Sequence, residues 1–262
     1  EDFKKSWHFV RDNFSAIVAN SYDLQYFRQL ILQLAIRGLL IPKNLNVRYQ
    51  CITTNNSEKI PFLQIPKHWQ KIPLGELGKV VGGGTPSRSS PSYWEGDIPW
   101  VSPKDMKFDY ISDTQEKITH LGLENSSVKL IPKESLLMVI RGMILAHSFP
   151  VAIAQNNVTI NQDMKALVLT EPKINNFLLL CLKALKMNFL SLVQRSSHGT
   201  CRLSGDQIFA QLIPIPPLEE QKRIVSKVDE LMKSCDRVEE SLSKKEELAS
   251  AISASVIYHL KL

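Results

Sequence analysis

Side chains that could carry out catalysis or bind a metal are far apart in this sequence. The six histidines and four cysteines show none of the short spacings that zinc sites use. They are His8, His68, His120, His147, His198 and His259, and Cys51, Cys181, Cys201 and Cys235. The sequence therefore predicts no metal site and no disulfide framework. Dispersed thiols are typical of a reducing, intracellular setting, so we expect a cytoplasmic protein.

One carboxylate–lysine pair has a spacing found in nucleases. Glu220 and Lys222 are separated by one residue, with Asp206 upstream, but a nuclease site needs carboxylates gathered around a metal ion. Both residues open a long helical pattern, which favours a structural role. The Pro-Pro pair at 216–217 has neither the Asn or Asp before it nor the aromatic residue after it that an amino-methyltransferase loop needs. We therefore predict no catalytic residue and no cofactor.

Apolar residues recur at helical spacing in residues 1–42. The first series is Phe3, Trp7, Val10, Phe14, Ile17 and Val18. A second helix, capped by Asp23, continues to Leu39, and Pro42 stops it. Residues 43–69 are polar and are expected to form an irregular linker.

Residues 70–217 contain most of the glycine and proline and several short β-type runs. These runs are 80–81, 136–140, 151–154 and 166–169, and a helix is expected over about 174–194. The predicted fold class is α+β: a compact domain of mixed strands with long loops, joined to a long helix.

Residues 218–262 form that helix, because they lack glycine and proline and carry apolar residues at alternating spacings of four and three. The spacing predicts a coiled coil whose interface residues are Ile224, Val228, Leu231, Cys235, Val238, Leu242, Ile252 and Val256. Such a seam needs a partner helix. The partner is a second copy of the chain, the N-terminal helices, or both, and a long surface helix is the alternative.

Composition limits the classes of partner. The net charge is +6 with 44% hydrophobic residues, so a polyanionic partner is compatible with the sequence but not required by it. The most apolar stretch, residues 176–193, is interrupted by Lys183 and Lys186, whereas a membrane span needs about 20 apolar residues. A membrane protein is therefore not expected.

The junction between domain and helix resembles a known family. Residues 213–242 contain a run that is characteristic of the specificity subunits of Type I restriction–modification enzymes, at the end of a target recognition domain. The run is Pro216, Pro217, Leu218, Glu220, Gln221, Arg223, Ile224 and Val225. Residues 82–87 (GGGTPS) and 96–106 (GDIPWVSPKDM) resemble the start of such a domain, 141–154 and 159–167 its middle, and 27–42 its neighbouring helix.

The resemblance implies a function. A specificity subunit binds double-stranded DNA but is not an enzyme; methylation subunits carry the S-adenosylmethionine chemistry, and a motor–nuclease subunit joins through them. Full-length members have two recognition domains and two helical regions, and this sequence has one of each. It therefore resembles a half-subunit or a fragment, and a native half-subunit would form a homodimer that recognises an interrupted palindrome.

A DNA-recognition domain needs polar loops, because base edges are contacted by Arg, Asn and Gln while basic and hydroxyl groups hold phosphates. Four segments provide such residues: 82–88, 102–107, 141–147 with 161–163, and 194–200. The predicted DNA contacts are Thr85, Ser87, Arg88, Lys104, Lys107, Arg141, Asn161, Gln162, Arg195, Ser196 and His198.

Each segment also has a simpler interpretation. Residues 82–88 could be a glycine-rich turn, Asn161 could cap a turn, and lone lysines are usually solvated. The alternative function is a coiled-coil protein–protein interaction module with no DNA role. Salt-dependent DNA binding would separate the two, because phosphate contacts weaken as salt rises.

Overall fold

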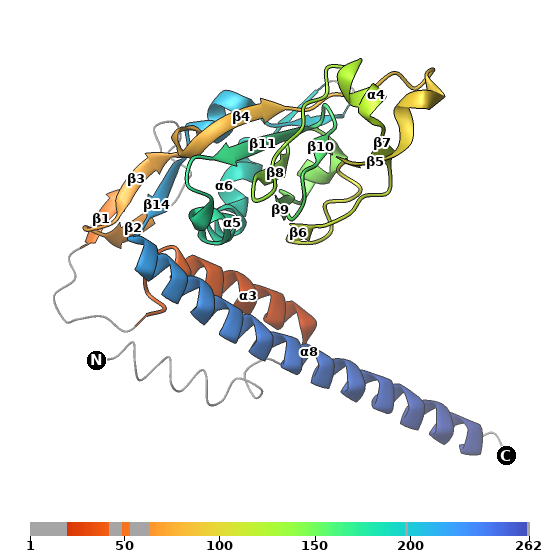
Figure 1. Ribbon diagram of the computed structural model, residues 1–262. Helices are drawn as coiled ribbons and strands as arrows, with labels where there is room; N and C mark the ends of the chain where they lie inside the picture. The colour runs from red at the N-terminus through yellow and green to blue at the C-terminus, as the bar shows by residue number, and fades with distance from the viewer. Residues whose placement is uncertain (1–19, 42–48, 53–62, 197–198, 261–262) are drawn as a thin grey trace.

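The structure is a computed structural model that describes residues 20–41, 49–52, 63–196 and 199–260. The helix predicted over residues 1–18 lies outside this range. The described chain forms an α+β domain from which one long helix projects (Figure 1). The predicted fold class is confirmed.

The central sheet is built from the apolar runs that the sequence predicted as strands. Its order is β4 (Gly78–Gly82), β11 (Met164–Leu169), β8 (Leu136–Val139), β9 (Val151–Ala154) and β6 (Tyr110–Ile111). All neighbours are antiparallel except β6, which is parallel to β9. Every residue of β8 and β9 is buried, because both faces of these strands are covered, and this explains their continuous apolar sequence.

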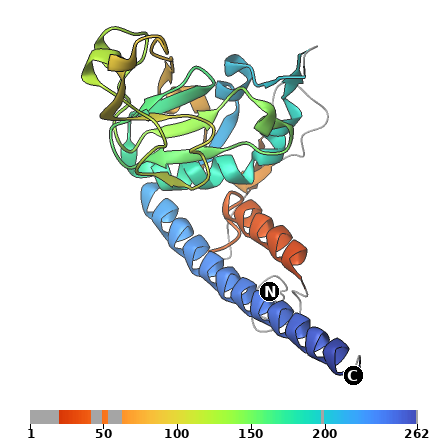
Figure 2. The ribbon, with the colours of Figure 1, turned by 90° about the vertical axis from the view of Figure 1, so that its right-hand side faces the viewer.

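A smaller three-stranded sheet extends the domain. Its order is β10 (Thr159–Ile160), β5 (Trp94–Val101) and β7 (Lys117–Ile118), followed by the short helix α4 (His120–Glu124). It has its own apolar cluster, formed by Ile98, Trp100, Ile118 and Val128. The region 84–128 consequently stands out from the rest of the domain, at the upper left of Figure 2.

The segment predicted as an irregular linker contains two paired strands. They are β1 (Tyr49–Ile52) and β2 (Leu63–Pro66), and β3 (Gln70–Pro73) follows and pairs with β14 (Leu212–Ile215). Ile65 and Trp69 are buried in the main core. Pro61 and Pro66 enclose the short apolar run Phe62, Leu63 and Ile65, which is too brief to establish an alternation. The sequence therefore did not reveal that this segment contributes to the core.

The helix predicted over residues 174–194 is shorter and broken. It consists of α5 (Asn175–Ala184) and α6 (Lys186–Ser191), separated at Leu185. The carbonyl of Ala184 accepts hydrogen bonds from the side-chain amides of Gln29 (3.1 Å) and Gln33 (2.5 Å). A contact from another element thus coincides with the break.

Those glutamines belong to α3 (Ser21–Ala35), whose N-cap differs from the prediction. The side chain of Asn20 accepts from the backbone N–H of Asp23 at 3.0 Å, so Asn20 rather than Asp23 is the cap. The helix ends before Gly38, whose φ of +63° and close approach to the Trp69 ring both require glycine.

The long helix α8 (Leu218–Leu260) has 43 residues, which corresponds to about 65 Å. α3 lies antiparallel beside its first half (Figure 1). Arg28 of α3 donates to Asp236 and Glu239, both at 2.8 Å. α8 therefore has an intramolecular helical partner over part of its length.

The seam of α8 divides into a covered and an exposed part. Ile224, Val228, Leu231 and Cys235 are buried in the chain's own core, beside α3 and α5, so the helix that covers these four residues is an N-terminal one, which was one of the partners left open by the sequence. Val238 and Leu242 are half-buried against the same core. Leu248 and Ile252 are 63% and 56% exposed, and the side chain of Val256 lies outside the described residues.

Candidate nucleic-acid interface

Two of the four predicted polar segments, 82–88 and 141–147 with 161–163, meet at one end of the central sheet. β11 lies between β4 and β8 and is antiparallel to both, so the ends of β4 and β8 and the start of β11 lie at the same end. Residues 83–88, 161–163 and 140–142 occupy these positions. We call this the loop end of the sheet.

Close backbone contact joins the first two segments. A Cβ atom on Gly83 would lie 1.9 Å from the carbonyl oxygen of Asn161, so glycine is required there. Gly84 donates its N–H to the carbonyl of Ile160 at 2.9 Å. The hydroxyl of Thr85 donates to the side-chain oxygen of Gln162. The glycine-rich turn therefore fixes Thr85 and Gln162 side by side at the surface.

The third segment is joined through Asp163. Its carbonyl accepts from the N–H groups of Ile140 (2.9 Å) and Arg141 (3.1 Å). Its carboxylate lies 3.7 Å from Nε of Arg141, and both side chains remain partly exposed. Asp163 thus orients Arg141 without removing it from solvent.

A two-stranded hairpin adds the fourth segment. It is formed by β12 (Gln194–Arg195) and β13 (Cys201–Arg202), and an isolated bridge pairs Arg202 with Arg141. Gly142 donates to the carbonyl of Cys201 and Leu203 donates to the carbonyl of Ile140, both at 2.9 Å. In Figure 2 the chain near residue 200 lies at the upper right, opposite the region 84–128, with α3 and α8 below.

The hairpin presents Arg195 and Ser196 to solvent. The hydroxyl of Ser196 accepts from the N–H of Thr200 at 3.1 Å and thereby closes the described part of the turn. Gly199 has a φ of +83°, which a residue with a Cβ would adopt only with strain. His198 lies outside the described residues.

Arg88 is held in a cluster of aromatic and acidic side chains. Its guanidinium lies 3.7 Å from the centre of the Trp94 ring and donates two hydrogen bonds to Glu116. This hydrogen bonding holds the pKa of Glu116 below its usual range, against the effect of partial burial, and the charges of Arg88 and Lys104 add to it. Ser87, at the same turn, shares a 2.7 Å hydrogen bond with Ser89.

Asn161 lies in the turn between β10 and β11. It is 7% exposed, and its side-chain oxygen accepts from the N–H of Asp163 at 3.1 Å. The side chain shapes the turn, as the simpler interpretation expected, and its contact with a base stays a prediction. Gln162 is the exposed amide of the pair.

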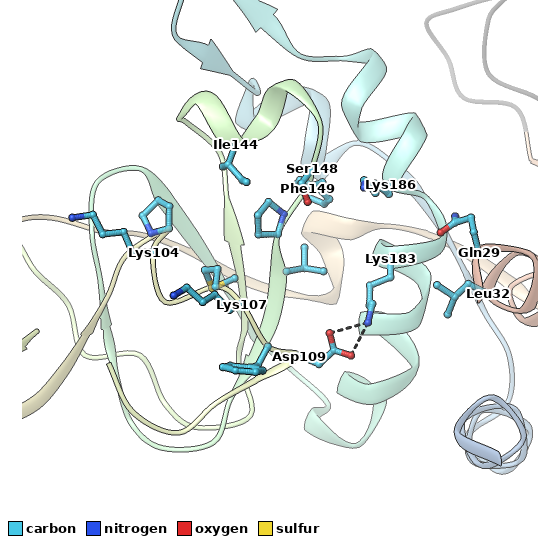
Figure 3. A pocket seen from close by; sticks show the side chains of 15 residues that line it. Gln29, Leu32, Lys104, Lys107, Asp109, Ile144, Ser148, Phe149, Lys183 and Lys186 are labelled. Carbon is cyan, nitrogen blue, oxygen red and sulfur yellow. Dashed lines mark hydrogen bonds and ion pairs between the residues drawn. The ribbon is translucent and has the colours of Figure 1, made fainter. Parts of the chain in front are cut away.

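Lys104 and Lys107 lie on a separate loop, although Lys104 is near enough to Glu116 for its charge to act on that carboxylate. Both are exposed on the loop between β5 and β6, which Asp105 organises by accepting from the N–H groups of Ser102 (2.8 Å) and Gln115 (3.0 Å). The two lysines line a cavity of about 460 Å³ between this loop, the chain before β9, α5 and α3 (Figure 3).

Arg202 is the residue that sequence reasoning missed. Arg202 is exposed between Cys201 and Leu203, which are both fully buried. The sequence therefore alternates apolar and charged residues at these three positions, as in a strand with one buried face. The pattern spans three residues and was too short to recognise as a strand. The loop end consequently carries four arginines, Arg88, Arg141, Arg195 and Arg202.

The pairs considered for catalysis do not converge. Glu220 lies 2.9 Å from Nε2 of His68, while Lys222 donates to Glu219 at 2.7 Å. Within the described ranges, no group of three or more His, Cys, Asp or Glu side chains is arranged to hold a metal ion. In the same part of the chain, no helix combines the length and apolar character that crossing a membrane requires.

Exposed arginines and amides on closely spaced loops at one end of a sheet form the kind of surface that binds nucleic acid. The sequence profile described as "Type I restriction modification DNA specificity domain" matches residues 66–248. The chain belongs to this family, and membership supports a role in DNA recognition.

Two curated relatives agree with this assignment. The specificity subunit of the Type I restriction enzyme EcoR124I/EcoR124II from Escherichia coli is 32% identical over 205 residues, covering 78% of this chain and 50% of the relative. The MjaIX specificity subunit from Methanocaldococcus jannaschii is 32% identical over 189 residues, covering 69% and 42%. The chain therefore spans about half the length of the curated relatives it matches.

A solved structure has a similar fold. The HsdS subunit from Thermoanaerobacter tengcongensis superposes with a TM-score of 0.58 at 16% identity, over 95% of this chain and 53% of that subunit. At this identity the similarity concerns the fold alone.

Proposed function

We propose that this chain is a non-catalytic, sequence-specific DNA-recognition component of a Type I restriction–modification system, and that it recognises one half of a bipartite target. The observation that carries the proposal is the loop end, where continuous backbone hydrogen bonds join residues 83–85, 161–163, 140–142 and 201–203. Arginines and an exposed glutamine on a hydrogen-bonded framework suit base contact, which needs side chains held in fixed positions.

The proposed DNA contacts follow from exposure. Base contact suits Gln162, Arg141, Arg195 and Arg202, since glutamine pairs with adenine and arginine with guanine. Phosphate contact suits the hydroxyl and imidazole side chains of Thr85, Ser87, Ser196 and His198. Arg88 would contact DNA after its hydrogen bonds with Glu116 break. Lys104 and Lys107 strengthen the positive field next to the duplex.

We further propose that methylation subunits dock on the chain and bring the motor–nuclease subunit with them. The relatives named above support this, because they are specificity subunits of Type I restriction enzymes. A native half-subunit would dimerise through the exposed part of α8, since Ile252 continues the seam beyond α3 and Leu248, one turn before it, is also exposed. A twofold dimer would bind an interrupted palindrome.

Methylome sequencing of the host with and without this gene tests the proposed function. We expect one interrupted methylated motif to disappear with the gene, and a duplex containing that motif to bind the assembled complex more tightly than a scrambled duplex. Affinity for DNA should fall steeply with salt. An unchanged methylome, together with equal affinity for the two duplexes, would exclude the proposal and favour the interaction module without a DNA role.

A further inference from the structure

The cavity beside the loop end has an apolar lining and a basic rim. Leu32 of α3, Phe149, Val151 and Ile144 contribute apolar surface from three segments of the chain. Phe108 also lines it and is 73% exposed, which is unusual for a large aromatic side chain. Leu32, Phe149 and Val151 are themselves buried, so Phe108 and the half-buried Ile144 supply the exposed apolar surface at this cavity. An exposed aromatic side chain beside a cavity is typical of an interaction site.

The rim carries four lysines and one carboxylate. The carboxylate belongs to Asp109, and Nζ of Lys183 donates to both of its oxygens, at 2.8 and 2.6 Å (Figure 3). This pair fixes the loop before β6 against α5. Among the residues that the structure describes, no ion pair neutralises the other rim lysines, Lys104, Lys107 and Lys186. The rim therefore has an uncompensated positive charge.

The size and lining limit the occupant. A cavity of about 460 Å³ accommodates a few side chains, not a folded domain. A DNA duplex would satisfy the lysines, but it has no apolar group that could fill a space between Leu32, Phe149 and Val151. A peptide segment supplies both an apolar side chain and carboxylates, and this combination matches an interface with an apolar centre and a charged rim.

We propose that this groove binds a short acidic segment of the methylation subunit, with a large apolar side chain in the cavity and Asp or Glu residues on the rim lysines. This inference rests on the proposed function, because it presumes that methylation subunits dock on the chain. Because α3 also lines the cavity, one methylation subunit could touch both the domain and a helix.

The test compares two double variants with the same change of charge. Lys107→Glu/Lys186→Glu alters the rim, and Lys129→Glu/Lys133→Glu alters exposed lysines outside the cavity lining. The full-length chain is titrated with its methylation subunit, and separately with a duplex containing the target motif. We expect the rim variant to bind the methylation subunit about tenfold more weakly than the control variant. Because Lys107 also belongs to the positive field proposed for DNA, the single variant Lys186→Glu is the one that should weaken subunit binding at unchanged DNA affinity.

Phe108→Ala tests the apolar lining of the groove without changing the charge of the chain. Because the Phe108 side chain is exposed, its loss should not unfold the domain, so weaker binding would not result from unfolding. It should weaken subunit binding and leave DNA affinity unchanged. Carbodiimide treatment of the complex should then join Lys107 or Lys186 to a carboxylate of the methylation subunit, because the reagent links groups already in contact.

Each alternative has a separate outcome. Wild-type protein that binds DNA specifically but does not bind the methylation subunit would remove the docking role and this inference with it. If the methylation subunit binds the rim variant and Phe108→Ala as tightly as the wild-type chain, the inference is overturned and the docking role remains. A selective loss of DNA affinity would assign the groove to DNA, and cross-links to Glu246 or Glu247 of a second copy would assign it to self-association.

Discussion

At the scale of residues, the proposed DNA recognition depends on how a few exposed side chains are held in position at the loop end. Arg141 and Arg202 are directly opposite each other in an antiparallel bridge. Like charges in this arrangement destabilise a sheet, so the fold gains nothing from having two arginines there. An anionic ligand would turn this repulsion into a favourable contact, which makes Arg202 the most informative residue to change.

We expect Arg202→Ala to weaken specific DNA binding by about 1–3 kcal/mol if the side chain contacts a base. Binding to non-target duplexes should change much less. Thermal stability should stay the same or rise slightly, because the repulsion with Arg141 is removed. Fluorescence anisotropy with both duplexes measures this, and Arg237→Ala on α8 is the matched control. Equal losses on both duplexes would mean a phosphate contact instead.

Glu116 controls Arg88 in a way that depends on pH. Because the folded-state pKa of Glu116 is lowered, the stabilising contact is fully present above the ordinary glutamate range and is lost as the pH falls through the lowered value. Glu116→Gln should reduce the loss of stability in that acidic window. The effect should be small, since both side chains are substantially exposed.

The same variant has a consequence at neutral pH. Arg88 would be released and the local charge would become more positive, so non-specific DNA affinity should rise and its dependence on salt should steepen by about one unit of slope. Denaturation across acidic pH and salt titrations of binding test the two effects. Weaker DNA binding by Glu116→Gln would indicate that the contact with Glu116 positions Arg88 for DNA.

At the scale of elements, α8 is a single helix with two environments. Its first half completes the core with α3 and α5, and its second half is exposed. Such a helix can be part of the domain and also extend from it as a rigid arm. The two halves should therefore respond differently to the loss of apolar side chains.

Ile224→Ala should destabilise the protein by about 2–5 kcal/mol, because it leaves a cavity in the core. Ile252→Ser should change the stability of the monomer by no more than about 0.5 kcal/mol, since its side chain is exposed. Urea denaturation at low protein concentration compares them. A large loss from Ile252→Ser under these conditions would show that another part of the chain covers this position.

At the scale of the whole molecule, the domain and its helical arm together determine how two recognition units would be spaced. If α8 pairs with a second copy, the distance between two loop ends is set by the register of that pairing. The number of uncontacted base pairs in the centre of the proposed DNA target would then reflect the geometry of the helix.

We expect Leu248→Glu/Ile252→Glu to shift a dimer toward monomer without changing monomer stability, because charges would replace the exposed seam residue Ile252 and the exposed Leu248 one turn before it. Sedimentation over a range of protein concentrations measures the equilibrium, and Lys244→Glu/Ser250→Glu on the same helix is the control. A dimer that tolerates the seam variant must use another surface.

The amino-acid sequence determined the long helix, the four apolar strands of the central sheet and the polar loops between them, because each depends on local periodicity or on residue type. Local pattern cannot report which segments are neighbours. Antiparallel pairing of β11 with β4 and β8 brings residues 83–88, 140–142 and 161–163 together. The hairpin adds Arg202, which forms a β-bridge with Arg141 although the two residues are more than sixty positions apart in the sequence.

Tertiary structure also decided which polar residues are available. Asn161 and Gln162 are adjacent amides with the same chemistry, but one is buried in a turn and the other is exposed. Likewise the seam of α8 is uniform in sequence, whereas its first half is covered by α3, because covering depends on contacts between segments distant in sequence. The chemistry of each side chain is local, and its accessibility is a property of the folded chain.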